Sequence, residues 1–117
     1  MTSRRAPAPG VPVRGSAGGR PIMALLDLLG RRWALRVLWE LRDGPLQFRA
    51  LQEHCGGISS SVLNDRLGEL RSAGIVARGP GGYALSEDGL DLLADLEPLQ
   101  AFSERWAERT LKSPAAG

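Results

Sequence analysis

Three glycine-marked breaks divide the middle of this chain into short segments, and their spacing limits the folds open to it. The breaks are Gly44-Pro45, Gly56-Gly57 and Gly74. Gly44 suits the left-handed end of a helix that Pro45 cannot continue, and Gly56-Gly57 forces a turn. Between the breaks, apolar residues recur at three- and four-residue steps, which indicates helices. The resulting order of helix, turn, short helix over about 49–55, turn and third helix is typical of a helix-turn-helix unit.

The helical pattern begins near Pro21. Apolar residues at helical spacing predict helices over 22–29 and 33–41, which Gly30 separates. Upstream, the chain is rich in Pro, Gly, Ala and Arg without periodicity. We therefore expect residues 1–20 to form a flexible arm, and residues 112–117 to form a disordered tail.

The third helix is the segment best suited to contact a partner. Ser59 is its expected N-cap, because a serine hydroxyl can accept a hydrogen bond from a free backbone N–H two or three residues on. Leucines at helical spacing then predict a buried stripe, made of Leu63, Leu67 and Leu70. Small polar residues are left facing outward near its start: Ser60, Ser61, Asn64 and Asp65. Such a helix packs on one side and offers hydrogen-bonding groups to a DNA groove on the other.

A hairpin and a long helix are expected after Gly74. Strands over about 75–78 and 83–85, joined by a tight tip at 79–82, predict a small wing. Ser86 is the expected cap of the C-terminal helical segment, which Pro98 should kink or divide. The stripe in this segment is more apolar than a small domain needs, so it predicts a two-fold interface between copies; it comprises Leu92, Leu96, Leu99, Phe102 and Trp106.

Length and composition narrow the class of protein. A chain of 117 residues with 43% hydrophobic content can build one domain with a core of its own. Its longest apolar run, residues 22–26, is far shorter than the ~20 residues of a membrane span. The first 20 residues lack the apolar stretch of a secretory signal, and one cysteine forms no disulfide within a chain. We expect a cytoplasmic protein that has no contact with membranes.

Charge is distributed unevenly along the chain. Residues 1–85 contain twelve arginines and six acidic residues, whereas residues 86–117 contain three basic and seven acidic residues. A basic front and an acidic back suit a protein that turns one face to phosphates. Catalysis has little support, because one histidine and one cysteine form no metal or triad spacing and no Gly-rich phosphate loop follows a strand. We predict no enzyme activity, cofactor or metal.

Several motifs, taken jointly, resemble the HxlR-type winged helix-turn-helix regulators over roughly residues 21–107. They are Gly30-Arg31-Arg32-Trp33, Asp43-Gly44-Pro45 with Phe48, Gly57-Ile58-Ser59 with Leu63, Arg66, Leu67 and Leu70, Gly74-Ile75-Val76, and Tyr83-Ala84-Leu85-Ser86 with Gly89. The resemblance implies a bacterial DNA-binding homodimer joined by its first and last helices. Some members sense electrophiles, oxidants or small apolar ligands.

Two positions depart from the family pattern. Arg20 stands where members commonly carry a cysteine, which excludes thiol sensing at that site. Only four residues separate Arg78 from Tyr83, so the wing is short and its contact with the minor groove is correspondingly less expected. The predicted fold is thus mainly α with a small β-hairpin wing, with a winged helix-turn-helix DNA-binding domain over 21–86 and C-terminal dimerisation helices over 87–111.

DNA contacts can be assigned by residue type. Asn64 can pair with adenine through two hydrogen bonds, and serines can reach base edges or phosphates. Asp65 can accept from cytosine, although pairing with a neighbouring arginine is the stronger expectation. Guanidinium groups bind phosphate oxygens, so phosphate contacts are expected at Arg31, Arg32, Arg49 and Arg78. Arg66 can either reach phosphate or tie the third helix to the rest of the domain. The predicted DNA-binding set is Ser59, Ser60, Ser61, Asn64, Asp65, Arg66, Arg31, Arg32, Arg49 and Arg78.

Large apolar residues have two interpretations. They can line a ligand pocket between protomers, since small-molecule sites are mostly apolar and aromatic. They can also be core or interface anchors. The candidates are Leu25, Leu29, Trp33, Trp39, Leu92, Leu96, Leu99, Phe102 and Trp106. Cys55 is expected to be a half-buried structural residue, because adjacent residues on a helix point apart and His54 is poorly placed to activate it.

Two functions follow from these observations. The first is a homodimeric, sequence-specific DNA-binding transcriptional regulator, with a small-molecule effector as a further partner. The alternative is a winged-helix module that binds a protein or a metabolite without sequence-specific DNA binding. Asn64, the arginines and the helix order favour the first, and the short wing and Asp65 favour the second.

Overall fold

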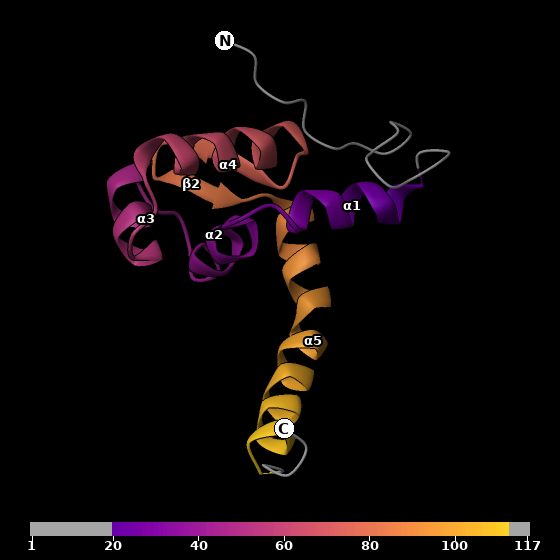
Figure 1. The fold of residues 1–117 in the computed structure, drawn as a ribbon. Helices are drawn as coiled ribbons and strands as arrows, with labels where there is room; N and C mark the ends of the chain where they lie inside the picture. Colours follow the sequence, from indigo (N-terminus) through magenta and orange to yellow (C-terminus); the bar gives the residue numbers. More distant parts are fainter. Residues whose placement is uncertain (1–19, 113–117) are drawn as a thin grey trace.

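Five helices and one two-stranded hairpin make up residues 20–112, the part of the chain that this computed structural model describes (Figure 1). In chain order they are α1 (Pro21–Leu29), α2 (Ala34–Glu40), α3 (Phe48–Cys55), α4 (Ser60–Ser72), β1 (Val76–Gly79), β2 (Gly82–Leu85) and α5 (Glu87–Lys112). The predicted class, mainly helical with a small hairpin, is confirmed. Apart from Arg20 and Lys112, the arm and tail expected at the two ends lie outside the described residues. Within the described part, no helix is long and apolar enough to cross a membrane.

Short polar side chains begin two of the helices as predicted. The Ser59 hydroxyl accepts a hydrogen bond from the backbone N–H of Val62 at 3.2 Å and caps α4. The Ser86 hydroxyl accepts from the N–H of Gly89 at 3.0 Å at the start of α5. At the other end of α4, Gly74 adopts a φ of +79°, which lets the N–H of Ile75 bond to the carbonyl of Leu70 at 2.9 Å. These contacts fix both ends of α4.

Two helix boundaries differ from the prediction. α2 ends at Glu40 and the chain reaches Gly44 through a turn, in which the N–H of Arg42 bonds to the carbonyl of Trp39 at 3.1 Å. Gly44 has a φ of +138°, so it is not the left-handed helix cap expected there. Of the two effects expected of Pro98, a kink or a division of the segment, division is wrong, because α5 runs as one helix through Pro98. Pro98 and Ala94, whose carbonyl loses its intrahelical donor, are both exposed, so water can satisfy that carbonyl.

The wing is a tight antiparallel hairpin. Its register runs from Val76 opposite Leu85 to Gly79 opposite Gly82, which leaves Pro80-Gly81 as the turn. Each strand therefore extends closer to the tip than predicted. Leu46, between α2 and α3, forms a single antiparallel bridge with Tyr83.

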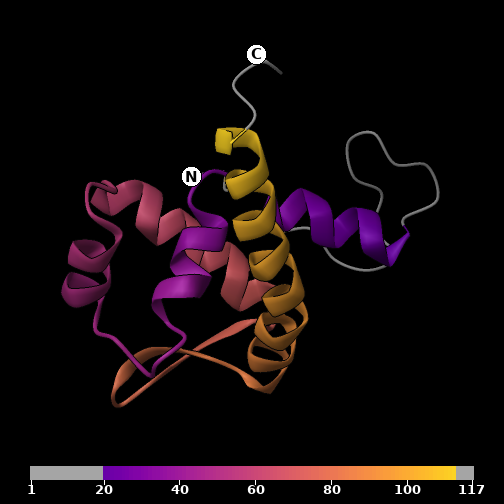
Figure 2. The same ribbon diagram turned by 90° about the horizontal axis from the view of Figure 1, so that it is seen from below.

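The core lies where α2, α3, α4 and the hairpin meet. Leu63, Leu67 and Leu70 of α4 are fully buried, as predicted from their spacing. They belong to one apolar cluster with Val37, Leu41, Leu51, Ile58, Val76 and Tyr83. α5 leaves this cluster and projects away from the side of the fold that carries α4 (Figure 1). Seen from below, α5 runs between α2 and α1 (Figure 2).

Candidate nucleic-acid interface

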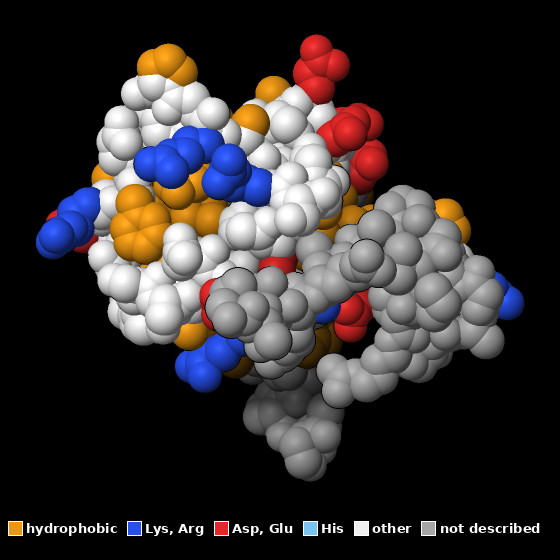
Figure 3. All heavy atoms as spheres, turned by 90° about the horizontal axis from the view of Figure 1, so that it is seen from above, with side chains coloured by type: hydrophobic (Ala, Val, Ile, Leu, Met, Phe, Trp, Pro, Cys, Tyr) orange, Lys and Arg blue, Asp and Glu red, His pale blue; other side chains and the backbone are white. Residues whose placement is uncertain are grey.

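The outer side of α4 is an exposed polar surface at one end of the molecule. Ser60, Ser61, Asn64 and Asp65 are all exposed, whereas the leucines on the opposite side of the helix are buried. Gly68 lies further along the helix and is exposed too, with no atom within 4 Å of the position that a Cβ would take. Viewed from the α4 side, backbone and uncharged polar side chains dominate this end, with acidic side chains at one edge (Figure 3).

The start of α4 is held by a glutamine that the sequence analysis did not single out. The Gln52 side-chain amide donates to the hydroxyl of Ser60 at 3.0 Å and to the carbonyl of Ile58 at 3.3 Å. Gln52 therefore connects α3 to the beginning of α4 across the turn. The Ser60 hydroxyl keeps its own proton for a further acceptor, and Ser61 lies 3.4 Å from Ser59 between the hydroxyl oxygens.

Three of the arginines assigned to phosphate are exposed: Arg32, Arg49 and Arg78. The guanidinium of Arg78 lies 5.3 Å from the ring centre of Tyr83, and that of Arg32 lies 6.0 Å from the ring centre of Trp33. Basic groups above hydrophobic side chains are visible beside the polar surface in Figure 3. Aromatic rings under the guanidinium groups hold these cations near the surface while leaving their edges open.

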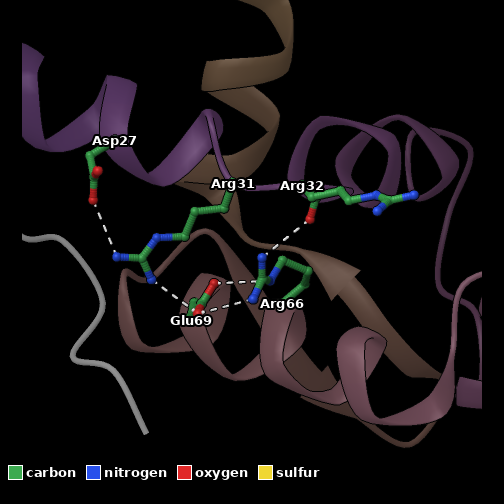
Figure 4. A network of polar contacts seen from close by, with 5 residues as sticks. All are labelled: Asp27, Arg31, Arg32, Arg66 and Glu69. Carbon is green, nitrogen blue, oxygen red and sulfur yellow. Dashed lines mark hydrogen bonds and ion pairs between the residues drawn. The ribbon is translucent and has the colours of Figure 1, made fainter.

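Arg31 and Arg66 are instead engaged inside the protein (Figure 4). The Arg31 guanidinium lies 3.0 Å from a carboxylate oxygen of Glu69 and 3.2 Å from one of Asp27. Arg66 lies 3.1 Å from the other oxygen of Glu69. It also donates to the carbonyl of Arg32 at 3.3 Å. Of the two roles left open for Arg66, the contacts show the tie between α4 and the rest of the domain.

Arg31 needs a correction to its expected role. Its side chain is only 16% exposed and lies between two carboxylates, so this geometry does not support the phosphate contact predicted for it. The sequence marked a cation at this position but could not show which anion it faces. Asp65 also differs from expectation, because it forms no ion pair with an arginine within residues 20–112.

Exposed hydrophobic side chains gather on α1, α2 and α5. Of the residues assigned to a dimer interface or ligand pocket, Trp39, Leu99, Phe102 and Trp106 are exposed, by 38% to 58%. Leu29 is buried in the core, and three other residues pack against the core cluster: Leu25, Trp33 and Leu92. Leu96 is half-buried. Five further exposed residues on the same three helices were not predicted: Ile22, Leu26, Leu35, Leu90 and Leu111.

A groove runs between α2 and α5. It contains two cavities, of about 490 and 270 Å³, which share Trp39, Leu93, Glu97 and Gln100 as lining residues. The guanidinium of Arg42 lies 4.2 Å from the ring centre of Trp39 at one side of the groove. The groove therefore combines an apolar floor with an aromatic ring and polar groups at its rim.

Cys55 is more buried than predicted. It is 2% exposed within the core, and burial raises the pKa of its thiol, as does Glu40, whereas Arg36 opposes the shift. His54 points elsewhere, with its Nδ1 3.5 Å from a carboxylate oxygen of Glu40. A protonated, buried thiol is a packing group rather than a nucleophile. Within residues 20–112, no cluster of three His, Cys, Asp or Glu side chains forms a candidate metal site.

An exposed polar helix over a three-helix core, followed by a short hairpin, defines a winged helix-turn-helix protein of the DNA-binding class. More narrowly, the chain belongs to the HxlR-like helix-turn-helix family, whose model matches residues 28–111. This family consists of transcriptional regulators, so the chain is a transcriptional regulator of the HxlR type.

Individual relatives agree with this placement. The chain is 35% identical over 89 residues to the HTH-type transcriptional regulator YodB of Bacillus subtilis, which covers 70% of this chain and 80% of YodB. The crystal structure of quinone-bound YodB aligns with a TM-score of 0.68 at 34% identity, over 72% of this chain and 96% of that one. A structure from Thermoplasma volcanium, described as a possible HxlR family transcriptional factor, aligns with a TM-score of 0.65 at 29% identity, over 72% of this chain and 82% of its own.

Proposed function

We propose that this regulator is a cytoplasmic homodimer that binds specific DNA sequences by placing α4 of each protomer in the major groove. The observation that carries the proposal is the exposed polar row on α4, Ser60, Ser61, Asn64 and Asp65, backed by fully buried leucines. A recognition helix must present its N-terminal side chains to base edges from a rigid support. The caps at Ser59 and Gly74 and the contact from Gln52 provide that support.

The chemistry of the row fits base recognition. The Asn64 side-chain amide carries both a donor and an acceptor, so it can form two hydrogen bonds with the major-groove edge of one adenine. The exposed serines at the start of the helix can reach a base or a phosphate. Arg32, Arg49 and Arg78 supply exposed cations for the DNA backbone, which fixes position without reading sequence.

Dimerisation is supported by the exposed apolar side chains on α1 and α5. Leu99, Phe102 and Trp106 are 45% to 58% exposed in the single chain, and Ile22 and Leu26 are each 54% exposed. Apolar surface of this extent on α1 and α5 favours burial against an identical copy across a two-fold axis. Two recognition helices about 34 Å apart would then meet successive major grooves.

A small apolar effector fits the groove between α2 and α5. The groove is lined by Trp39 and Leu93 and lies next to the proposed dimer surface of α5. YodB has been crystallised with a bound quinone, which supports planar apolar molecules as the effectors of the present regulator. Binding here would be noncovalent, because Arg20 replaces the family cysteine and Cys55 is buried.

Fluorescence titration with menadione, a planar quinone, tests the effector site. Saturable quenching is expected in the wild type and should largely disappear in Trp39→Phe. Trp106→Phe, which changes a tryptophan outside the groove lining, is the matched control and should retain most of the change. Quenching that persists in Trp39→Phe, or a linear unsaturated response in the wild type, rejects this site.

An electrophoretic mobility shift with the DNA upstream of the protein's own gene and its neighbours tests DNA recognition. Asn64→Ala should weaken binding by roughly 5-fold or more, since a bidentate base contact is worth about 1–3 kcal/mol. Ser72→Ala, at the exposed far end of the same helix, is the control and should bind as the wild type does. A folded dimer that shifts none of these fragments favours the alternative, a protein- or metabolite-binding module, which the exposed carboxylate of Asp65 and the short wing would suit.

A further inference from the structure

Glu69 is the buried charged residue of the described chain, at 9% exposure. It lies on α4, on the side turned toward the α1–α2 turn (Figure 4). One of its carboxylate oxygens lies 3.0 Å from the guanidinium of Arg31 and the other lies 3.1 Å from that of Arg66. A largely buried carboxylate between two guanidinium groups is held firmly, because separation would leave a buried charge unpaired.

The two arginines connect Glu69 to the end of α1 at separate points. Arg31 belongs to the turn after α1 and also pairs with Asp27, in the last turn of α1, at 3.2 Å. Arg66 donates to the backbone carbonyl of Arg32 in the same turn at 3.3 Å. The α1–α2 turn and the second half of α4 are therefore joined through side chains as well as through the apolar core.

The turn itself has a constrained backbone. Trp33, its last residue, has a φ of +76°, which makes it the non-glycine residue with a positive φ among residues 20–112. Its side chain packs against the core. A bulky residue keeps such a conformation only when its surroundings determine it. The contacts through Arg31 and Arg66 join this strained turn to α4. We therefore expect the turn to move together with α4 and to keep its own backbone conformation.

We propose that Glu69 is a positioning residue that couples α1 to the DNA-reading helix α4 through Arg31 and Arg66. The inference rests on the proposed function, in which α1 contributes to the dimer and α4 enters the groove. A change in how two protomers meet along α1 is transmitted to α4 and changes the separation of the two recognition helices. The separation must match the DNA repeat, so this coupling controls binding to the operator.

The test compares Glu69→Gln, Arg31→Met and the double variant with the wild type, and uses Asp91→Asn, an exposed acidic residue of α5, as the control. DNA affinity is measured for operator and for unrelated DNA, well below each melting temperature and across a range of salt concentrations. Both single variants should lose about tenfold in operator affinity, a usual size for coupling between sites. Affinity for unrelated DNA should change little, because it depends on phosphate contacts. The double variant should be no weaker than the singles.

The direction of the change in operator affinity distinguishes loss of coupling from a simple effect of charge. Removing the carboxylate of Glu69 makes the protein more positive, so electrostatics alone would tighten DNA binding. A loss of operator affinity with an unchanged salt slope therefore requires misplacement of α4. If Glu69→Gln does not fold, Asp27→Asn provides a second test, because it removes the other carboxylate partner of Arg31. This variant should show a smaller loss of operator affinity.

Three outcomes overturn the inference. Glu69→Gln that lowers the melting temperature but keeps operator affinity within twofold shows a packing role only. Arg31→Met that lowers the salt slope by about 1.8 per dimer shows that Arg31 contacts phosphate, at ~0.9 per contact. A wild-type dimer that binds no DNA at all rejects the proposed function itself, and the coupling with it, and this result is visible before any variant is made.

Discussion

Leu46 and Tyr83 exchange two backbone hydrogen bonds, of 2.9 Å from the Leu46 N–H and 2.8 Å from the Tyr83 N–H. This exchange attaches the segment between α2 and α3 to the wing as a one-residue third strand. It also brings the Leu46 carbonyl against Gly82, where a Cβ would overlap it. The wing is thus anchored to the helix-turn-helix unit by backbone contacts as well as by side chains.

Gly82→Ala should destabilise the protein. Gly82 has a φ of +110° and no room for a methyl group beside Leu46. We expect a loss of at least about 2 kcal/mol in the free energy of unfolding from strain and overlap. Gly79, its partner across the hairpin, has no atom within 4 Å of its Cβ position, so Gly79→Ala is the matched control. Thermal melts followed by circular dichroism give the comparison; equal melting temperatures for the two variants would contradict this account of the wing.

DNA binding should depend strongly on salt. If a dimer neutralises six phosphates, log K should fall with log salt at a slope of about −5, at ~0.9 per phosphate. Arg49→Gln removes an exposed cation from each protomer and should reduce the slope by about 1.8. Arg105→Gln, an exposed arginine on α5, should leave it unchanged. Fluorescence anisotropy at several salt concentrations measures the slopes, and a slope near zero in the wild type would exclude binding through the phosphate backbone.

Trp106→Glu should convert the dimer to monomers. Trp106 is 56% exposed in the single chain, so its loss removes little of the chain's own packing. A charge introduced at a two-fold interface is present on both protomers, so the free-energy cost of burying it on dimerisation is incurred twice. Light scattering should report half the mass with a nearly unchanged helical spectrum. Glu104→Lys changes the charge about 160° around the helix from Trp106 and should remain dimeric. An intact dimer in Trp106→Glu places the interface elsewhere.

The buried thiol should make stability depend on pH. The folded pKa of Cys55 lies above its ordinary value because burial disfavours the thiolate. The folded state therefore keeps a proton that the unfolded state loses above about pH 8.5. The contribution of this group is complete below that pH and declines as the pH rises toward the folded pKa. Urea titrations from pH 7 to 10 should show that the free energy of unfolding falls more steeply with pH for the wild type than for Cys55→Ala. An equal pH dependence in the two proteins would contradict the raised pKa of Cys55.

Helix positions and the polar row of α4 could be predicted from sequence because both depend on local rules. Apolar spacing placed Leu63, Leu67 and Leu70 in the core, and hydroxyl caps located the starts of α4 and α5. The division expected at Pro98 does not occur, because a missing donor in an exposed helix is tolerated where water can satisfy the carbonyl.

The roles of individual arginines could not be predicted. Arg31, Arg32, Arg49 and Arg78 look alike in sequence, and only the fold brings Glu69 and Asp27 to Arg31. Gln52 was missed for the same reason, since its partner Ser60 lies across a turn. The exposed apolar residues of α1 and α2 also needed the structure, because core and surface stripes have the same helical period.

Beyond the groove that α5 forms with α2, every residue of α5 from 105 to 111 is exposed in the single chain. A helix of about a dozen residues is marginal in water when nothing packs against it. In the absence of a second copy, this stretch would fray, and its aromatic residues, which are already exposed in the single chain, would promote proteolysis and aggregation. If the proposed dimer forms, the folded fraction of α5 rises with protein concentration, and the regulator acquires its full architecture only above the dissociation constant of that dimer.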